Sequence, residues 1–347
     1  MNRICLVAAL FLALLAVRTA SADEIRNLYE AEVAVTGQGS EERQLALRSA
    51  FEVVLTKVSG QGAVAAESAL GEALASPDRY VQQFRYREPP AGQSGLTFWA
   101  RFDSAAVNAL LRSHRLPVWG AVRPATLLWL VLEERGRRRL VGANDPGAVA
   151  SSITAFAERR GLPVHFPLLD LEDLRRIQPS DVWGDFRDII QAASERYHAQ
   201  VILSGALARD GDYYRARFTL QLGNDALRWE SVGSLDEVIA AGLGRATDEI
   251  AQGYGQTSGG ASLVTVQVRN VQSLEDYLRA MDYLDALSGV ARVELVTVEA
   301  DQVIYRLTLQ GATHALVQAI GLGDTLVPDS EPAPVPAQAE LRYRLLQ

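Results

Sequence analysis

The sequence predicts an α+β fold of three small modules with mainly antiparallel sheets. Three observations predict it. Runs that alternate apolar and polar residues, typical of half-buried strands, are interleaved with segments whose apolar residues recur every three or four positions, typical of helices. Asp210-Gly211 stands between two alternating runs and indicates a hairpin. The 347 residues, 48% of them hydrophobic, are enough for two or three domains, and a Gly/Ser-rich linker at 253–262 favours three.

The first module is expected to cover residues 23–118. A helix is predicted to follow Ser40, because Leu47, Phe51, Val54 and Val58 fall on one face at helical spacing. Alternating apolar residues mark the strands on either side of it. The predicted elements are strand 28–35, a helix ending at Ser59-Gly60, helix 64–75, strand 80–87, strand 96–102 and a helix ending at His114.

The central module is expected over residues 119–252, with helices packed on one face of its sheet. A β-run at 126–132 turns and returns at Leu140-Val141, and Asp145-Pro146 begins a helix. A three-strand meander follows later in the chain, with its turn at Asp210-Gly211. The remaining predicted elements are strand 162–166, helices 171–177 and 183–197, strands 201–208, 214–222 and 227–232, and helix 236–252.

The third module, residues 263–327, is expected to be ferredoxin-like. Its pattern gives the order β-α-β-β-α, the beginning of a split βαβ arrangement. Two segments are candidates for the last strand, 325–327 and 341–346, and the Pro-rich tail at 328–347 contains the second of them. This terminal strand either closes its own sheet or adds to the sheet of a partner. The two alternatives stay open at this stage.

Residues 1–22 have the three parts of a secretory signal peptide. Arg3 precedes 14 uninterrupted apolar residues, and Ala20-Ser21-Ala22 supplies the small residues that signal peptidase accepts. As a helix, this apolar run reaches about 21 Å, short of a hydrocarbon core of about 30 Å. We therefore expect cleavage between Ala22 and Asp23, export to the periplasm, and no transmembrane segment in the mature chain.

Composition excludes several classes of function. The net charge of −8 argues against a nucleic-acid binder, which presents a basic surface to phosphates. Cys5, the only cysteine, lies in the predicted signal peptide, so disulfide scaffolds and thiol catalysis are excluded. The four histidines have no metal-binding spacing. The sequence predicts no catalytic residue, no cofactor and no metal site.

An acidic cluster around Trp183 offers the one candidate for catalysis. Asp170, Asp173, Asp181 and Asp185 lie close together in the sequence, and paired carboxylates beside an aromatic ring are suited to glycoside hydrolysis. Helix capping explains the same residues, because Asp170 and Asp181 stand where helices are predicted to begin. A hydrolase requires two of these carboxylates to face each other across an open cleft.

Two further groups of residues suggest binding or assembly. Trp119, Arg123 and Trp183 are expected to help form a junction between the first two modules, although a core position explains each of them as well. The basic run 135–139 follows two glutamates; it fits either a grip on lipopolysaccharide or phospholipid head groups, or a solvated hairpin tip with alternating charge.

A series of short strings resembles an exported proteobacterial family, domain of unknown function 2066. The resemblance spans roughly residues 24–255 and implies a Gram-negative protein that faces the periplasm; it transfers no catalytic residue. The strings are Lys57–Gly60 at the end of a helix that begins near Glu41, Tyr80–Phe84, Phe102-Asp103, Leu110-Leu111, Leu116–Gly120, Arg123-Pro124, Trp129-Leu130, Arg160–Pro163, Pro167–Asp170, Val182–Gly184 and Ala193–Tyr197.

From these observations we expect a non-catalytic periplasmic protein that binds another envelope protein or an outer-membrane component. Small α+β modules, an acidic surface and a Pro-rich tail fit this function. Two alternatives remain: a cell-wall glycan hydrolase that uses the acidic residues near Trp183, and a carrier of lipid or another small ligand, which needs an internal cavity. The sequence leaves the oligomeric state and the identity of the partner open.

Overall fold

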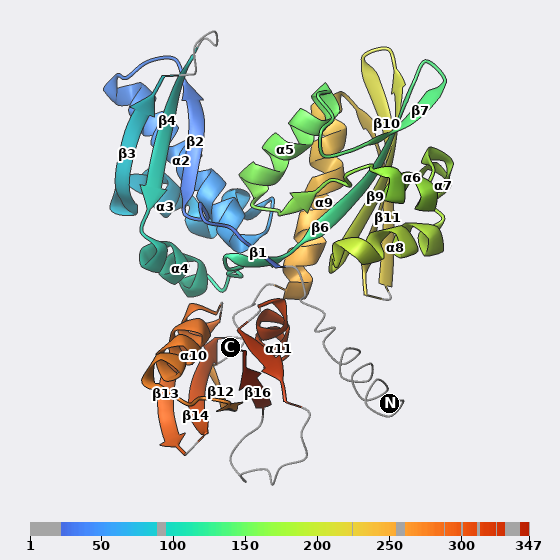
Figure 1. The fold of residues 1–347 in the computed structure, drawn as a ribbon. Coiled ribbons are helices and arrows are strands. Elements are labelled where there is room, and N and C mark those ends of the chain that lie inside the picture. The colour runs from blue at the N-terminus through green and yellow to red at the C-terminus, as the bar shows by residue number, and fades with distance from the viewer. Residues whose placement is uncertain are drawn as a thin grey trace, which may run out of the picture.

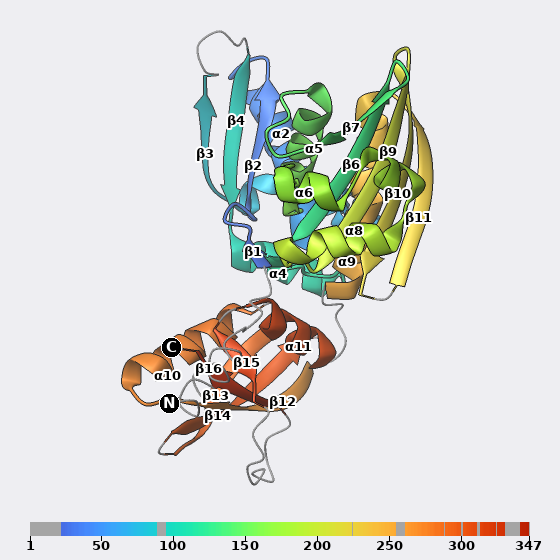
Figure 2. The same ribbon diagram turned by 45° about the vertical axis from the view of Figure 1, so that its right-hand side comes forward.

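The computed structural model describes residues 22–88, 95–223, 225–254, 261–287, 289–299, 301–310, 313–323, 325–329 and 341–346. The predicted signal peptide, except for Ala22, lies outside these residues. The chain has the predicted α+β architecture, with three units arranged around separate sheets (Figure 1). The first two units lie side by side, and the C-terminal unit lies beyond the end at which they meet (Figures 1 and 2).

The N-terminal unit packs a long helix on a three-stranded antiparallel sheet of order β2-β4-β3. Phe51 of the helix stacks on Tyr80 and Phe102, with ring centroids 4.9 and 5.0 Å apart. The predicted helix 64–75 is formed only over Gly71–Ala75; two short 3₁₀ turns replace its first part, where Ser68 favours helix poorly. The elements are β2 (Glu30–Val35), α2 (Ser40–Ser59), α3 (Gly71–Ala75), β3 (Val81–Arg87), β4 (Leu96–Phe102) and α4 (Ser104–Ser113).

The central unit has helices on both faces of its sheet, which corrects the expectation of helices on one face. Strand order is β11-β10-β9-β6-β7, with β8 paired to β6; the β6–β9 and β6–β8 pairs are parallel. The elements are β6 (Thr126–Glu134), β7 (Arg137–Val141), α5 (Ala148–Arg160), β8 (Val164–His165), α6 (Leu171–Arg176), α7 (Pro179–Gly184), α8 (Arg187–Ser194), β9 (Val201–Asp210), β10 (Tyr213–Leu222), β11 (Asp225–Gly233) and α9 (Leu235–Tyr254).

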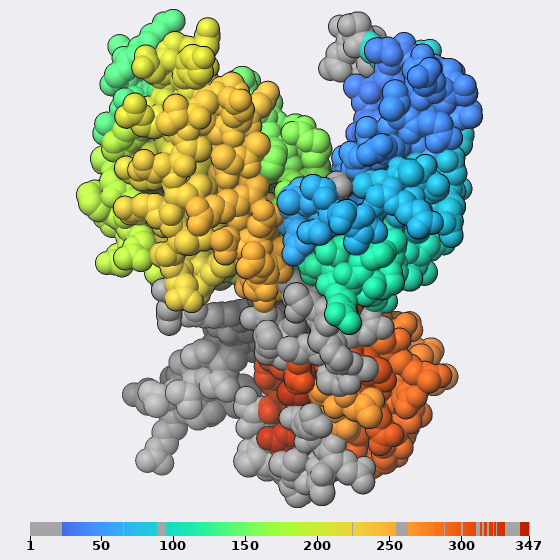
Figure 3. Space-filling view, turned by 180° about the vertical axis from the view of Figure 1, so that it is seen from behind, coloured from blue at the N-terminus to red at the C-terminus, as the bar shows by residue number. Residues whose placement is uncertain are grey.

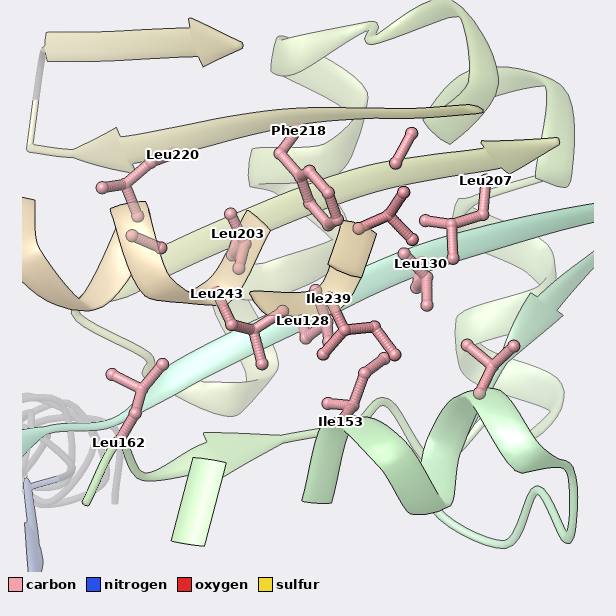
Figure 4. Packing of buried hydrophobic residues seen from close by; sticks show 14 of the residues in the cluster. Leu128, Leu130, Ile153, Leu162, Leu203, Leu207, Phe218, Leu220, Ile239 and Leu243 are labelled. Atoms are coloured by element: carbon pink, nitrogen blue, oxygen red, sulfur yellow. The ribbon is translucent and has the colours of Figure 1, made fainter. Parts of the chain in front are cut away.

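Strand β6 explains the two layers of helices. Leu128 and Leu130 point into the core under α5 and α9, where Ile153 and Leu243 meet them (Figure 4). The intervening Trp129 and its neighbours Leu127 and Val131 point into a second core under α6, α7 and α8. A strand that buries both faces reads as a continuous apolar run. Figure 1 shows the two helical layers on opposite sides of the sheet.

The predicted helix 183–197 is interrupted at Asp185. Asp185 ends α7 in a left-handed conformation, φ 54°, and its carboxylate turns inward to accept hydrogen bonds from Ser204 Oγ (3.3 Å) and Thr219 Oγ1 (3.1 Å). This side chain therefore lies against the sheet and not on an outer helix face. The buried hydrogen bonds stabilise a break that helical periodicity does not reveal.

A short two-stranded sheet holds the residues next to the predicted cleavage point. Strand β1 (Ala22–Glu24) pairs antiparallel with β5 (Val122–Pro124), so that Asp23 lies opposite Arg123. Cleavage itself involves residues outside the described part of the chain and stays a prediction.

The C-terminal unit contains both segments that were candidates for the last strand. Its sheet has the order β13-β14-β12-β16-β15, and β16 runs parallel to β12 between that strand and β15. The terminal strand is therefore internal to its own sheet. The elements are β12 (Ala261–Arg269), α10 (Leu274–Ala286), β13 (Val290–Val298), β14 (Gln302–Gln310), α11 (Thr313–Leu322), β15 (Leu326–Pro328) and β16 (Leu341–Leu345).

Within the described ranges, we find no helix whose length and apolar character suffice for crossing a bilayer.

We expect Tyr343→Ala to destabilise the C-terminal unit, because this buried side chain of β16 packs in the unit's core. Truncating a buried aromatic residue costs about 3–5 kcal/mol. Amide hydrogen exchange of residues 264–268 should accelerate strongly, whereas Arg344→Ala, an exposed neighbour in the same strand, should leave it unchanged. Equal exchange rates in the two variants would show that β16 contributes no stability.

Candidate functional site

A buried guanidinium joins the N-terminal and central units. Arg123 of β5 is fully buried, and the ring of Trp119 lies 3.9 Å from its guanidinium carbon. Every hydrogen bond that the structure shows for Arg123 goes to a backbone carbonyl. The acceptors are Gly120 (2.9 Å), Gly161 (2.6 Å), Arg160 (3.3 Å), Lys57 (2.6 Å) and Trp119 (3.0 Å).

These acceptors place the guanidinium at the carbonyl ends of two helices. Lys57 belongs to the last turn of α2, and Arg160 ends α5. The last carbonyls of a helix lack partners within it and carry a partial negative charge. Arg123 therefore satisfies carbonyls of both helices at once, and burial lowers its pKa without a carboxylate among the partners shown.

A second group of contacts extends the joint to α9. Arg160 Nη2 donates to the carbonyl of Gly60 (3.0 Å) and to Asp248 Oδ1 (2.5 Å), and the amide of Gly62 donates to the same carboxylate oxygen (2.9 Å). Gly60 has φ 72°, and a Cβ there would lie 2.4 Å from Cβ of Ala251. The close approach of α2 to α9 therefore requires glycine at this position.

Two of the three residues expected at the junction between the first two units lie there, and the third does not. Trp119 and Arg123 meet at the joint, as described above. Trp183 lies in α7, on the face of the central sheet that α6, α7 and α8 cover, and its ring contacts Arg138 of β7 at 3.9 Å. The junction hypothesis is wrong for Trp183, because the inward turn at Asp185 fixes α7 against β9 and β10 instead.

Lys57, the only lysine in the chain, is also buried at the joint. Its side chain is 4% exposed and donates from Nζ to the carbonyls of Asn27 (3.3 Å) and Glu30 (2.9 Å). Burial, and then the nearby charge of Arg123, lower the pKa of Lys57 to about 8. Because the folded protein disfavours the charged form of Lys57, the free energy of unfolding depends on pH.

The acidic residues around Trp183 are engaged in structural contacts. Asp170 caps α6 and pairs with Arg196 (2.7 Å), which holds the pKa of Asp170 below its usual range. Asp173 is buried and accepts hydrogen bonds from Tyr197 Oη (2.5 Å) and from Arg196 (3.0 Å). Burial and the bond to Asp173 raise the pKa of Tyr197 to about 12.

The other two acids of that cluster lie elsewhere. Asp181 accepts from the amide of Gln178 (2.7 Å) in a capping box at the start of α7, and Asp185 faces Ser204 and Thr219 of the sheet. Hydrolysis requires two of these carboxylates to face each other across an open cleft. Instead, Asp170 and Asp173 share the guanidinium of Arg196, Asp181 caps a helix and Asp185 faces the sheet. Caps and a buried network account for all four carboxylates.

Metal chemistry receives no support from the described side chains. In the part of the chain that the structure covers, no three His, Cys, Asp or Glu residues gather closely enough to hold a metal ion.

Helices α6, α7 and α8 cover only half of one face of the central sheet. The other half of that face forms a trough beside α7. The trough has a volume of about 400 Å3, and its lining includes Trp183, Ala208, Tyr213, Arg215, Arg217 and Val232. Alternation along β10 and β11 places Tyr213, Arg215 and Val232 on the same face as α7, and Arg215 lies opposite both Ala208 and Val232. Tyr213 and Val232 are 66% and 68% exposed.

Sequence reasoning missed the trough. The alternating string Tyr213 to Arg217 indicates that Tyr213, Arg215 and Arg217 share a face, but the meander alone does not show which helices cover that face. The helices on this face of the sheet extend only as far as Trp183, whose carbonyl accepts a hydrogen bond from Arg217.

Arg123→Met should destabilise the N-terminal and central units together. The substitution leaves carbonyls of α2 and α5 unpaired in the interior, and each unpaired carbonyl costs about 1–3 kcal/mol. Urea denaturation followed by tryptophan fluorescence measures the loss, and Arg175→Met, on the exposed surface of α6, is the matched control. A midpoint equal to that of the control contradicts the role of Arg123.

The stability of the chain should rise between pH 8 and 9.5. Across this window folded Lys57 releases its proton while the unfolded residue, with a pKa near 10.5, still holds it, so the unfolding free energy increases with pH, by about 2 kcal/mol. Urea denaturation of wild type and Lys57→Met at both pH values tests this. The increase should be smaller in Lys57→Met; an equal increase in both proteins contradicts the assignment.

Comparisons with known proteins characterise the first unit. Residues 22–120 match the family model Domain of unknown function (DUF8605), a range that covers β1 to α4 and ends at the joint. The resemblance to domain of unknown function 2066 is therefore wrong, since no match to that family is found. Of the strings that carried the resemblance, Lys57–Gly60 lies at the end of α2 and Leu116–Gly120 at the joint, where packing within this chain accounts for them.

No curated protein matches the chain. Among solved structures, the LpoB C-terminal domain from Salmonella enterica aligns with 12% identity and a TM-score of 0.21, over 37% of this chain and 91% of that one. A TM-score this low does not indicate a shared fold.

Proposed function

We propose that this chain is a non-catalytic binding protein of the periplasm, and that it binds an extended segment of another envelope protein along the trough. The observation that carries the proposal is the exposure of Tyr213 and Val232 on regular strands beside Trp183. Tyrosine, tryptophan and arginine are the residues that contribute most binding energy at protein interfaces. The pattern of residues 1–22 supports the compartment.

The trough offers an apolar floor and, at Arg215, a position for an acidic side chain of the partner, although its lining also includes Glu133, Asp210 and Glu230. The floor is small and apolar at Ala206 and Ala208, which leaves room for a side chain between Trp183 and Tyr213. Arg215 is exposed at the rim, and the described residues show no ion pair with it. An acidic side chain of the partner would form an ion pair with Arg215, and such pairs mainly increase specificity and the rate of association.

The trough lies at an edge of the sheet, which favours an extended partner. β11 pairs with β10 along one side only, and its other edge has no strand partner among the described residues. A partner that extends from the trough past β11 can form main-chain hydrogen bonds with this outer edge, the recognition mode known as β-augmentation.

Site-directed cross-linking in intact cells tests this function. In a Cys5→Ser background, Tyr213→Cys provides a single thiol in the trough, and Ala240→Cys places a thiol on the exposed surface of α9 as the control. A thiol-reactive cross-linker that crosses only the outer membrane should capture one protein through the Tyr213→Cys variant and not through the control. Absence of reaction with this reagent contradicts the compartment.

Affinity then tests the chemistry of the trough. With the captured partner purified, Arg215→Glu should weaken binding at least tenfold, whereas Arg175→Glu, the same charge reversal on α6, should change it less than twofold. Equal effects of the two variants, or equal cross-linking at both thiols, contradict the proposed binding site.

A further inference from the structure

Two hairpin tips of the central unit enclose a second, larger hollow. Strands β6 and β9 pair in parallel as far as Glu133 and Ala208, and beyond this point the β6–β7 and β9–β10 hairpins extend separately (Figure 1). The hollow between them has a volume of about 1100 Å3. Figure 3 shows these hairpins at the upper end of the central unit, away from the C-terminal unit.

Arginine dominates the lining of this hollow. Its basic residues are Arg135, Arg137, Arg138, Arg139 and Arg209, and Glu134 is its one acidic lining residue among those described. Three of the arginines have carboxylate partners: Arg138 pairs with Glu133, Arg139 with Asp145, and Arg209 with Glu134. The described residues show no ion pair for Arg135 or Arg137, so the hollow keeps an excess of positive charge in a chain of net charge −8.

The local fold positions the backbone of these arginines. Arg135 and Gly136 have φ values of 53° and 74° and form the tight turn of the first hairpin. Strand register then places Arg137 opposite Glu134 and Arg139 opposite the buried Leu132. The ion pair between Arg209 and Glu134, 3.3 Å, joins the two hairpins across the hollow.

We propose that this hollow binds a ligand that carries two or more phosphate groups. The guanidinium group donates two parallel hydrogen bonds to a phosphate, and it is more weakly hydrated than an ammonium group. Arg135 and Arg137 come from one hairpin and Arg209 from the other, so a ligand with several phosphates meets arginines on both sides. A single carboxylate group pairs with one guanidinium and leaves the other charges unmatched.

This site can be tested separately from the proposed partner site. Arg209 lines both the hollow and the trough, whereas Arg135 and Arg137 line the hollow and are absent from the trough. Substitution of these two arginines therefore tests the phosphate site alone.

Binding of two probes to the full chain tests the proposal. Inorganic tripolyphosphate, titrated by calorimetry, represents a soluble ligand, and phosphatidylglycerol vesicles, measured by co-sedimentation against phosphatidylcholine vesicles, represent lipid head groups. The double variant Arg135→Gln/Arg137→Gln should bind at least tenfold more weakly than wild type. Arg175→Gln/Arg187→Gln, which removes the same charge from the exposed surfaces of α6 and α8, should change binding less than twofold.

The two probes distinguish the sources of phosphate. Tripolyphosphate binding that the hairpin variant loses supports a soluble polyphosphorylated ligand, and vesicle binding that it loses supports a lipid head group. The proposal is overturned if wild type binds neither probe at 100 mM salt, or if both double variants weaken binding equally, because attraction then depends on net charge and not on this hollow.

Discussion

The relation between the first two units depends on one guanidinium bonded to the carbonyl ends of two helices. Arg123 is buried among backbone acceptors, and partial charges at the ends of α2 and α5 stabilise its positive charge. Two of these acceptors, the carbonyls of Lys57 and Arg160, belong to the long helices α2 and α5, so neither can move without its helix. The joint therefore fixes the orientation of α2 relative to α5, and Arg160 with Asp248 adds α9 to the same arrangement.

Both candidate binding surfaces lie on the central sheet at a distance from this joint. Helices cover one half of the face that carries the trough, and the acidic cluster around Asp173 holds those helices together through Arg196 and Tyr197. The carboxylates near Trp183 therefore contribute to the position of α7 and to the wall of the trough. In this reading, groups that suggest catalysis in the sequence act by supporting a binding surface.

Much of the fold could be predicted from local pattern, and much of the site could not. The stripe from Leu47 to Val58 and the turn at Asp210-Gly211 specify α2 and the β9–β10 hairpin, because both signals are contained in neighbouring residues. The apolar run at 127–132 is typical of a strand buried on both faces, so the second helical layer was accessible from sequence. The inward turn at Asp185 and the pairs made by Arg123 depend on residues far apart in the chain, and no local pattern encodes them.

The position of β16 affects the order in which the chain can fold as it emerges from N- to C-terminus. β12 has β14 on one side and β16 on the other, so its second neighbour arrives only after residues 341–345 have emerged. The joint is likewise completed only when Asp248 is available to Arg160. Contacts between residues so distant in sequence form slowly, because the intervening loop must close first. One edge of β12 therefore stays without its strand partner until the last residues of the chain have emerged.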